Sequence, residues 1–468
     1  MTGTGFEKIP AGARNILKRL DEAGYEAYIV GGCVRDCLLG QVPADWDITT
    51  SARPEEIKQI FHHTVDTGLQ HGTVTVLQRE DSRTTAYEVT TYRIDGIYED
   101  ARHPKEVSFT TELAEDLRRR DFTVNAMAYH PQKGLVDLYH GQEDLKERII
   151  RAVGDPGERF SEDALRMMRA IRFAAQLKGT IESKTWEALC RMHENIRHVS
   201  AERIRVEMEK LLLSERPDDF RFFYESGLTE FFLPEWDAMM QTEQETPHHC
   251  YNVGEHTLQT IRAMDTEKLK ETYPEGEYRT VLKNLRLALL LHDVAKPVCK
   301  TMDGDGTAHF KGHPAKGAGM AETILRRLRY DNETIETVVT LIRVHDSRWD
   351  PAPESMRRAI SRTGEKYFPM IFFLTRADVL GQSMYEREAK LALIDAQEES
   401  FRKIRAEGDC TSLKDLAVSG KDLIAAGVRP GPGMGELLNR MLEDVLGTPE
   451  HNEKGYLLDT YVMKREGS

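Results

Sequence analysis

The sequence predicts an α+β protein, with a mixed sheet in its N-terminal part and a long all-helical region after it. Short alternating or β-branched runs occur at 27–30, 73–77 and 85–91, all before about residue 148. From about residue 158 onward, apolar residues recur with the period of a helix almost throughout. The length of 468 residues is sufficient for several domains, each with its own hydrophobic core.

Four consecutive regions are expected from these patterns. They are a mixed-sheet head at 1–148, a helical neck and body at 149–240, a second helical domain at 241–400 and a helical tail at 401–468. The clearest helices are predicted at 162–177, 201–213, 282–291, 318–329, 334–344 and 385–406. Glycine, proline and polar clusters predict breaks at 154–157, 242–247, 303–307 and 429–435.

The composition excludes several classes of protein. Hydrophobic residues make up 40% and charged residues 30% of the chain, which is typical of a folded protein and not of a disordered one. No apolar run approaches the roughly 18 residues of a membrane span, and residues 1–10 lack the apolar stretch of a secretory signal. The six cysteines show no C-x-x-C spacing, so we expect reduced thiols and a cytoplasmic protein.

The charge balance argues against indiscriminate binding to a phosphate backbone, and DNA is therefore not an expected partner. The chain has 64 basic and 78 acidic residues, a net charge of -14. The segment 148–178 differs, because its seven basic and four acidic residues give a net charge of +3. We expect a polyanion to bind first at this segment.

The first candidate site begins where the strand at 27–30 ends. Gly31 and Gly32 follow this strand and lead into a short predicted helix through Leu39, with Arg35 in its first turn. Glycines in such a position let backbone N–H groups approach a phosphate, and a guanidinium can hold the phosphate with two hydrogen bonds. On its own, this pattern is more typical of an ordinary tight turn.

A pair of carboxylates follows ten residues after Arg35. Asp45 and Asp47 belong to a strand-like run through Thr50, whose period of two places both carboxylates on one face. Hard Mg²⁺ prefers such ligands and takes water and nucleotide phosphates as the others. Glu88, in the strand at 85–91, is a candidate for a third acidic ligand, with an ordinary edge-strand glutamate as the alternative.

A basic run at 118–120 comes next, followed by Asp121 and Asn125. Three guanidinium groups beside an acid and an amide can bind a triphosphate and read ribose hydroxyls. A basic run is nevertheless more often a solvated face of the protein.

The segment 161–173 carries further candidates for nucleotide binding. On a single helix, Asp163 would lie one turn before Arg166, and the arginines would advance by three along a ridge. Asp163 could accept a hydrogen bond from the amine of a base, and Arg166 could donate one to a ring nitrogen. The alternative is a surface ion pair that contributes about 0.2–0.5 kcal/mol.

These motifs, in this order, resemble those of the class II tRNA nucleotidyltransferases. The resemblance is carried by Gly31-Gly32-x-Val34-Arg35-Asp36, Asp45-x-Asp47, Arg119-Arg120-Asp121-Phe122-Thr123-x-Asn125-Ala126 and Asp155-Pro156-x-x-Arg159-Phe160-x-Glu162-Asp163-x-x-Arg166-x-x-Arg169-Ala170-x-Arg172-Phe173. The family includes the CCA-adding enzymes and the bacterial poly(A) polymerases, within the DNA polymerase β-like superfamily. The similarity covers about residues 25–210 and is weaker toward the end of the chain.

The resemblance implies an enzyme that adds CCA to tRNA 3′ ends from CTP and ATP, without a nucleic-acid template and with release of pyrophosphate. Asp45 and Asp47 would hold the catalytic Mg²⁺ ions in a head of the polymerase β type. The nucleotide would be bound by Gly32, Arg35, Arg120, Asp121, Asn125, Asp163, Arg166, Arg169 and Arg172. The implied partners are tRNA, ATP and CTP.

Two other products of the same chemistry are alternatives to CCA addition, because Asp163 and Arg166 resemble their counterparts in all of these enzymes. They are addition of A alone and poly(A) tailing. The segment 92–104 resembles the flexible loop that CCA-adding and A-adding enzymes need in order to switch to ATP. Addition of the two cytidines alone is therefore not expected.

A second constellation lies in the helical half of the chain. His256 is followed by His292 and Asp293 at the end of an apolar helix and by Asp378 farther on. This order resembles an HD-type metal phosphohydrolase domain, in which imidazole and carboxylate ligands hold a divalent metal. His313 and His345 could ligate a second metal or bind phosphate.

The HD resemblance implies a 2′,3′-cyclic phosphodiesterase or phosphatase, as a second or as the main activity. The alternative is a helical domain that has kept buried histidines and lost the activity. In the tail, the glycines of 429–435 precede an apolar-striped helix and could cradle an RNA phosphate, as similar tails of the family hold the tRNA elbow. An ordinary turn explains those glycines equally well.

Overall fold

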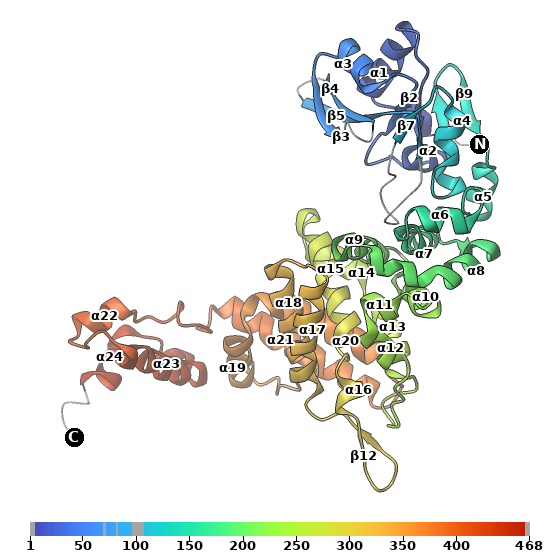
Figure 1. Ribbon diagram of the computed structural model, residues 1–468. Coiled ribbons are helices and arrows are strands. Elements are labelled where there is room, and N and C mark those ends of the chain that lie inside the picture. Colours follow the sequence, from blue (N-terminus) through green and yellow to red (C-terminus); the bar gives the residue numbers. More distant parts are fainter. Residues whose placement is uncertain (1–4, 69–71, 81–82, 96–106, 464–468) are drawn as a thin grey trace. The chain divides into compact units, whose positions relative to one another are not determined.

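The computed structural model describes residues 5–68, 72–80, 83–95 and 107–463. The chain forms two compact units, an N-terminal unit (Met1–Pro234) and a C-terminal unit (Glu235–Ser468). Figure 1 shows strands gathered in the first part of the chain and helices in the rest. The predicted α+β class, with a mixed sheet ahead of an all-helical region, is thereby confirmed.

A seven-stranded sheet of order β3-β4-β5-β2-β1-β8-β9 forms the N-terminal unit's core. Its strands are β1 (Ala27–Val30), β2 (Ile48–Thr50), β3 (Thr64–Gly68), β4 (Thr73–Glu80), β5 (Arg83–Thr91), β8 (Met127–His130) and β9 (Gly134–Asp137). The strands predicted at 27–30, 73–77 and 85–91 are confirmed. The pairing of β2 with β5 is parallel and the other pairings are antiparallel, so the sheet is mixed.

The strand-like run predicted from Asp45 to Thr50 is wrong in its first half. β2 begins only at Ile48, and both carboxylates lie in the loop before it. Ile48, Thr49 and Thr50 are buried, whereas Asp45 and Asp47 are exposed, so the strand begins where burial begins.

Five helices of the N-terminal unit accompany the sheet. They are α1 (Ala11–Glu22), α2 (Gly32–Leu38), α3 (Pro54–Ile60), α4 (Leu113–Arg118) and α5 (Gly141–Glu147). α1 buries Ile16, Leu17 and Leu20 and packs against β1 and β4, and α2 packs against β1 and β8. A two-stranded ribbon joins β6 (Arg93–Asp95) to β7 (Val107–Phe109). Most of the predicted ATP-switching loop at 92–104 lies outside the described residues.

The rest of the N-terminal unit is helical. After a short parallel pairing of β10 (Ile149–Ile150) with β11 (Thr180–Ile181), its helices are α6 (Pro156–Glu162), α7 (Leu165–Leu177), α8 (Ser183–Met192), α9 (Ala201–Leu212), α10 (Arg221–Glu225) and α11 (Thr229–Phe232). α12 (Pro234–Met240) begins where the two units meet in sequence. α7 packs against α9 and buries most of its length, so it forms the core of this helical part.

The single helix predicted over 162–177 is wrong, because the chain breaks at Asp163. This residue has an extended backbone (φ -145°, ψ 104°), and α7 starts two residues later. The Asp163 carboxylate accepts a hydrogen bond from the Leu165 N–H at 3.1 Å. An acidic side chain that satisfies a free N–H at a helix start stabilises a new helix at this point.

The C-terminal unit is a helical assembly. Its main helices are α13 (Val253–Ala263), α14 (Thr266–Thr272), α15 (Glu275–Leu291), α16 (Lys296–Cys299), α17 (His313–Arg327), α18 (Asn332–Val344), α19 (Pro353–Thr363), α20 (Phe368–Gly381) and α21 (Arg387–Glu407). α15 packs against α13, α18 and α20, and its last turns, from Leu285 to Leu291, are buried throughout. A hairpin of β12 (Thr301–Met302) and β13 (Ala308–His309) forms the predicted break at 303–307.

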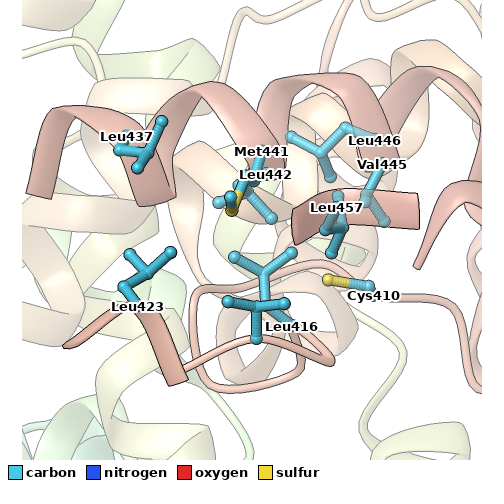
Figure 2. Packing of buried hydrophobic residues seen from close by; sticks show 10 residues of the cluster. Cys410, Leu416, Leu423, Leu437, Met441, Leu442, Val445, Leu446 and Leu457 are labelled. Carbon is cyan, nitrogen blue, oxygen red and sulfur yellow. The ribbon is translucent and has the colours of Figure 1, made fainter. Parts of the chain in front are cut away.

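The tail has a hydrophobic core of its own. It contains α22 (Gly420–Ala425), α23 (Pro432–Gly447) and α24 (Lys454–Tyr461). Figure 2 shows buried side chains of this core, among them Leu437 and Met441 of α23, Leu423 of α22 and Leu457 of α24. The break predicted at 429–435 is shorter than expected, because Pro432 already stands in the first turn of α23, where proline is well tolerated.

Within the described part of the chain, no helix combines the length and the apolar character that a membrane span requires. The six cysteines are all described, and none is in a disulfide.

Candidate active site and metal centre

Three carboxylates gather where β2 and β5 begin to run side by side. Ile48 lies opposite Val89 in the parallel register, so the preceding residues, Asp47 and Glu88, are neighbours on the same side. Burial raises the pKa of Asp47, the Arg120 guanidinium opposes this, and the charges of Glu88 and Asp45 raise it further. Mutual repulsion among exposed carboxylates is the condition that a divalent cation relieves.

The turn from β1 into α2 brings a guanidinium close to these acids. Gly31 has φ +83°, and a Cβ on it would lie 3.1 Å from Arg120 Nη1. The predicted short helix after the glycine pair is confirmed as α2, and Gly32 is its first residue. Glycine is therefore favoured at position 31 for two structural reasons, the positive φ of the turn and the close approach of Arg120.

Asp116 orients this arginine, and the sequence analysis did not find it. The Asp116 carboxylate is fully buried and accepts hydrogen bonds from Arg119 (2.8 Å), Arg120 (3.1 Å) and Thr49 Oγ1 (3.1 Å). Burial raises its pKa, but Arg120 and Arg119 outweigh this and hold the pKa below the ordinary value. The sequence does contain a signal for this pairing, because Asp116 stands four positions before Arg120, the spacing at which helical side chains meet.

Arg35, Asn125, Asp121 and Arg169 form a continuous hydrogen-bonded chain. Arg35 Nη1 donates to Asn125 Oδ1 (2.7 Å), Asn125 Nδ2 donates to Asp121 Oδ1 (3.2 Å), and Arg169 Nε donates to Asp121 Oδ2 (2.8 Å). Burial raises the pKa of Asp121, but Arg169 and Arg166 outweigh it and hold the pKa well below its usual range. The structure thus brings together four residues that the sequence analysis selected.

Asp163 and Arg166 do not form the expected pair. Asp163 Oδ2 lies 2.6 Å from Arg203 Nη2 of α9. Arg166 contacts the Glu162 carboxylate and donates from Nη2 to the Arg119 carbonyl at 2.9 Å. The ion pair between the two, which was the alternative, is therefore wrong, whereas the reading of a base by both residues stays a prediction.

Arg172, the last residue of the predicted arginine ridge, is buried. It is 5% exposed, its Nε donates to Glu207 of α9 at 2.6 Å, and its guanidinium stacks on Phe173 at 3.6 Å. Burial lowers the pKa of Arg172 to about 10, although Glu207 acts in the opposite direction. The Arg172 side chain therefore lies in the packing between α7 and α9.

The C-terminal unit brings together the four residues of the second constellation. His256 Nε2 lies 3.0 Å from Asp378 Oδ1, and His292 Nε2 lies 3.1 Å from Asp293 Oδ2. The two Nε2 atoms are 3.4 Å apart. Ligand atoms that share one metal at about 2.0–2.2 Å are separated by about 3.0–3.4 Å, so this spacing fits a single ion.

Backbone carbonyls fix the orientation of both imidazoles. His256 Nδ1 lies 3.2 Å from the Gly381 carbonyl, and His292 Nδ1 lies 2.7 Å from the Leu289 carbonyl. An imidazole that donates its Nδ1 proton in this way presents a lone pair at Nε2. In the neutral form these lone pairs face the carboxylate oxygens, an arrangement that either a proton on Nε2 or a metal cation stabilises, and these residues therefore fit a metal.

The carboxylates of this group are held in the charged form. Burial raises the pKa of Asp293, but His292 and Lys296 outweigh it and hold the pKa well below the usual range. Burial acts on Asp378 in the same direction, and hydrogen bonds with His256 and His292 outweigh it there. Charged carboxylates are the form that ligates a metal.

A cavity of about 740 Å³ opens onto this group. Asp293 and Asp378 line it together with the cationic side chains of Lys296, Arg348 and Lys390. Lys296 Nζ lies 2.7 Å from Asp293 Oδ2 and donates to Gln244 Oε1 at 2.7 Å. A volume of this size fits a small-molecule ligand, and the cations favour an anionic one.

Three family models match parts of the chain. The "Poly A polymerase head domain" matches residues 27–151, and the "Probable RNA and SrmB- binding site of polymerase A" matches residues 180–240. A model of tRNA nucleotidyltransferase domain 2 matches residues 316–461.

Curated relatives match along nearly the whole chain. A protein of Limosilactobacillus reuteri (strain DSM 20016), named CCA-adding enzyme, is 35% identical over 450 residues, which are 96% of this chain and 95% of the relative. A protein of the same name from Lactobacillus helveticus (strain DPC 4571) is 36% identical over 441 residues, 94% of each chain.

Solved structures give the same picture of the fold. The CCA-adding enzyme of Bacillus stearothermophilus, in complex with CTP, is 28% identical and matches 100% of both chains with a TM-score of 0.68. The CCA-adding enzyme of Thermotoga maritima, complexed with tRNA, is 20% identical with a TM-score of 0.59, covers 99% of this chain and 98% of its own, and is similar in fold.

Proposed function

This chain belongs to the family of CCA-adding enzymes, which are tRNA nucleotidyltransferases, and from that membership we propose that it adds C, C and A to tRNA 3′ ends. The donors are CTP and ATP, and each addition releases pyrophosphate. The observation that carries this function is the group of carboxylates beside the β1–α2 turn, with the Arg120 guanidinium close to Asp47 and Gly31. We propose a cytoplasmic location, where unfinished tRNA is found.

The family depends on a divalent metal, and we propose that it is Mg²⁺ held by Asp45 and Asp47, with Glu88 as a third acidic ligand. When bound, the metal lowers the pKa of the RNA 3′-hydroxyl and neutralises charge on the triphosphate. The register of β2 with β5 supports this role for Glu88, because it fixes that carboxylate beside Asp47.

The surrounding arginines hold the nucleotide. Arg120 is oriented by the buried Asp116 and lies close to Gly31. It can therefore bind a phosphate over the start of α2, where Gly32 offers its N–H. Arg35 and Asn125 are tied together and positioned for the sugar and phosphates. Asp121 acts through Arg169, because its carboxylate is occupied by that guanidinium. Arg172 acts as a positioning residue inside the neck.

We propose that Asp163 and Arg166 select the base. Asp163 accepts from an exocyclic amine and Arg166 donates to the adjacent ring nitrogen, a pattern that cytosine and adenine share and that uracil and guanine lack. The separate anchors on Arg203 and Glu162 support this role, because they fix each polar group without joining the two to each other.

We further propose that the four regions divide the work. Residues 1–148 carry the transfer, residues 149–240 bind base and RNA, residues 241–400 form an HD-type domain, and the tail at 401–468 binds RNA. RNA recognition is mainly by shape and backbone, because an enzyme that serves all tRNAs cannot read sequence far from the end.

A tRNA prepared with three endings tests the product. Bare, C-ended and CC-ended tRNA are incubated with Mg²⁺ and CTP, ATP or both, and the products are resolved to single nucleotides. We expect the bare tRNA to gain two cytidines and one adenosine and then stop. Extension of the CC-ended tRNA alone would instead identify an A-adding enzyme, and long adenosine ladders a poly(A) polymerase.

The C-terminal unit supports a second function, hydrolysis of a phosphate ester by an HD-type metal centre. The observation that favours it is the convergence of His256, His292, Asp293 and Asp378 on one point, beside a cavity lined with cations. The proposed substrate class is a 2′,3′-cyclic phosphate or a phosphate monoester.

A further inference from the structure

A smaller cavity of about 330 Å³ adjoins the cavity described above. It lies between the segment after α18 and the packed helices α20 and α21. The smaller cavity and the larger one of about 740 Å³ meet along six residues that line both, His345, Asp346, Arg348, Asp378, Gln382 and Lys390. A ligand in the larger cavity therefore has a second space directly beside it.

One face of α21 forms a wall of the smaller cavity. Its residues 389, 390, 393, 394 and 397 line the space, and this spacing places them on one side of a helix. Lys390 lines both cavities, whereas Gln397 lines only the smaller one. Seven residues of helix separate the two, a rise of about 10 Å. The wall therefore runs from a cationic end beside the larger cavity to a neutral end.

The charges of the smaller cavity nearly balance. Arg348 and Lys390 are accompanied by the acidic side chains of Asp346 and Glu386, in addition to the Asp378 that both cavities share. The larger cavity contains a further cation, Lys296. An anionic group is therefore favoured in the larger cavity, and an uncharged group in the smaller one.

Aliphatic side chains cover the middle of the smaller cavity. Val379 and Ile394 are buried and Leu393 is half-buried, and all three line the space. Its volume lies near the lower end of the range for small-molecule sites, about 300–1,000 Å³. A space of this size and character fits one planar base with its ribose and excludes an oligonucleotide.

Gln397 gives the neutral end a hydrogen-bond acceptor. This residue is 6% exposed, and its Nε2 donates to the Trp349 carbonyl at 2.7 Å. Within the described ranges, no donor is bonded to its Oε1. The contact with Trp349 fixes the amide, and an amide oxygen can only accept, so a ligand in the cavity satisfies Oε1 by offering an N–H.

We propose that the smaller cavity is a nucleoside subsite, which holds the base and ribose of a nucleotide whose phosphate lies in the larger cavity. Gln397 Oε1 accepts a hydrogen bond from the exocyclic amine of the base. Adenine and cytosine carry such an amine, whereas uracil presents an oxygen at the same edge. The proposal rests on the hydrolytic second function for the fate of the phosphate and not for the binding of the base.

Calorimetry on the full chain tests the subsite without turnover, because the protein is first treated with a chelator. The probes are adenosine 2′,3′-cyclic phosphate, uridine 2′,3′-cyclic phosphate and the base-free glycerol 1,2-cyclic phosphate. We expect the adenosine probe to bind about tenfold or more tightly than the base-free probe, since it buries the base against aliphatic side chains.

Leu393→Trp fills the smaller cavity and should remove the advantage of the adenosine probe. Leu391→Trp is the matched control, because Leu391 lies on the same helix and lines neither cavity. Ala389→Phe, at an exposed position of the cavity wall, is a second filling variant and should act in the same direction as Leu393→Trp. Retained CCA addition and an unchanged circular dichroism spectrum show that each variant is folded.

Gln397→Leu tests the reading of the base. We expect it to lower the preference for the adenosine probe over the uridine probe by about 3- to 10-fold, the value of one hydrogen bond. A purely structural role of Gln397 would instead weaken both nucleotides equally and leave their ratio unchanged.

A short RNA that ends in adenosine 2′,3′-cyclic phosphate is titrated in parallel. Tighter binding of the RNA than of the free nucleotide identifies an RNA end as the source of the ligand, and weaker binding identifies a mononucleotide. Loss of either through Leu393→Trp supports the subsite.

Equal binding of the adenosine and base-free probes, or adenosine binding that survives both filling variants, would overturn the subsite. Binding at the N-terminal transfer site would give the second of these results. Hydrolysis is measured separately after a divalent metal is added back. Base-dependent binding without hydrolysis would contradict the second function and leave the subsite standing, whereas equal hydrolysis of all three probes would contradict the subsite alone.

Discussion

The N-terminal and C-terminal units hold their acidic ligands in opposite ways. Asp45 and Asp47 are exposed on a loop, and the guanidinium close to Asp47, that of Arg120, is bonded to the buried Asp116 carboxylate. His256, His292 and Asp293 are buried, and each imidazole is fixed by a backbone carbonyl. An exposed site of this kind suits the large, negatively charged substrate that we propose for it, whereas the buried arrangement suits the proposed metal and a small anion.

The comparison shows which groups make each site rigid. In the N-terminal unit, buried acids such as Asp116 and Asp121 orient the arginines, and the exposed acids are the proposed metal ligands. In the C-terminal unit, helix ends and carbonyl groups orient the ligands directly. In the N-terminal unit, substitution of an exposed carboxylate or of a buried partner of an arginine should therefore change activity or stability most.

Asp47→Asn should cause the largest loss of nucleotide incorporation among these variants. Removing the charge of a metal ligand in the transfer site should lower single-turnover incorporation of CMP by about 10³-fold or more, because several kcal/mol of charge stabilisation are lost. Glu88→Gln is the matched substitution on the neighbouring strand and should cause a smaller loss. An Asp47→Asn variant that kept a tenth of the wild-type rate would show that these carboxylates are not the metal ligands.

Glu207→Gln should destabilise the helical part of the N-terminal unit. It leaves the buried Arg172 guanidinium without its charged partner, and breaking such a pair costs about 3–5 kcal/mol. Urea unfolding followed by tryptophan fluorescence measures the change in the free energy of unfolding. Glu209→Gln, on the same helix, is the control, since among the described residues the Glu209 carboxylate has one ion-pair contact, at 3.9 Å from Arg205 Nε. Equal effects of both variants would contradict the buried pair.

Asp163→Ala should weaken the choice of base. Loss of the acceptor for an exocyclic amine should lower the preference for CTP over UTP by about 10- to 100-fold, the value of one good base contact. The preference is the ratio of kcat/KM values for the two nucleotides on bare tRNA. Arg203→Lys, which keeps a cation near Asp163, should have a smaller effect. A preference unchanged by Asp163→Ala would remove this residue from base selection.

The smallest expected effect is a shift in the pH dependence of nucleotide incorporation caused by Glu88→Gln. The pKa of Asp47 is raised, so its carboxylate takes up a proton, and loses metal affinity, at a higher pH than an ordinary aspartate does. Glu88→Gln removes a charge that raises this pKa, so the acidic limb of the kcat/KM profile should move to lower pH. Movement in the opposite direction, or none, would contradict the proximity of these two carboxylates.

Local motifs explain why much of both sites could be predicted from the sequence. The turn after β1, the carboxylates before β2 and the four residues that converge in the C-terminal unit follow short patterns whose order along the chain is informative. The break before α7 could not be predicted, because the apolar period continues across Asp163 and the break depends on one capping contact. Asp163 with Arg203 and Arg172 with Glu207 join different helices, and no local pattern contains such partners.

The most direct test of two separate centres measures both activities on two variants. Asp45→Ala and Asp293→Asn are each assayed for CCA addition to bare tRNA and for hydrolysis of a 2′,3′-cyclic nucleotide with added divalent metal. We predict that Asp45→Ala loses CCA addition and keeps hydrolysis, and that Asp293→Asn does the reverse. Loss of both activities from either substitution, in a folded variant, would contradict the account.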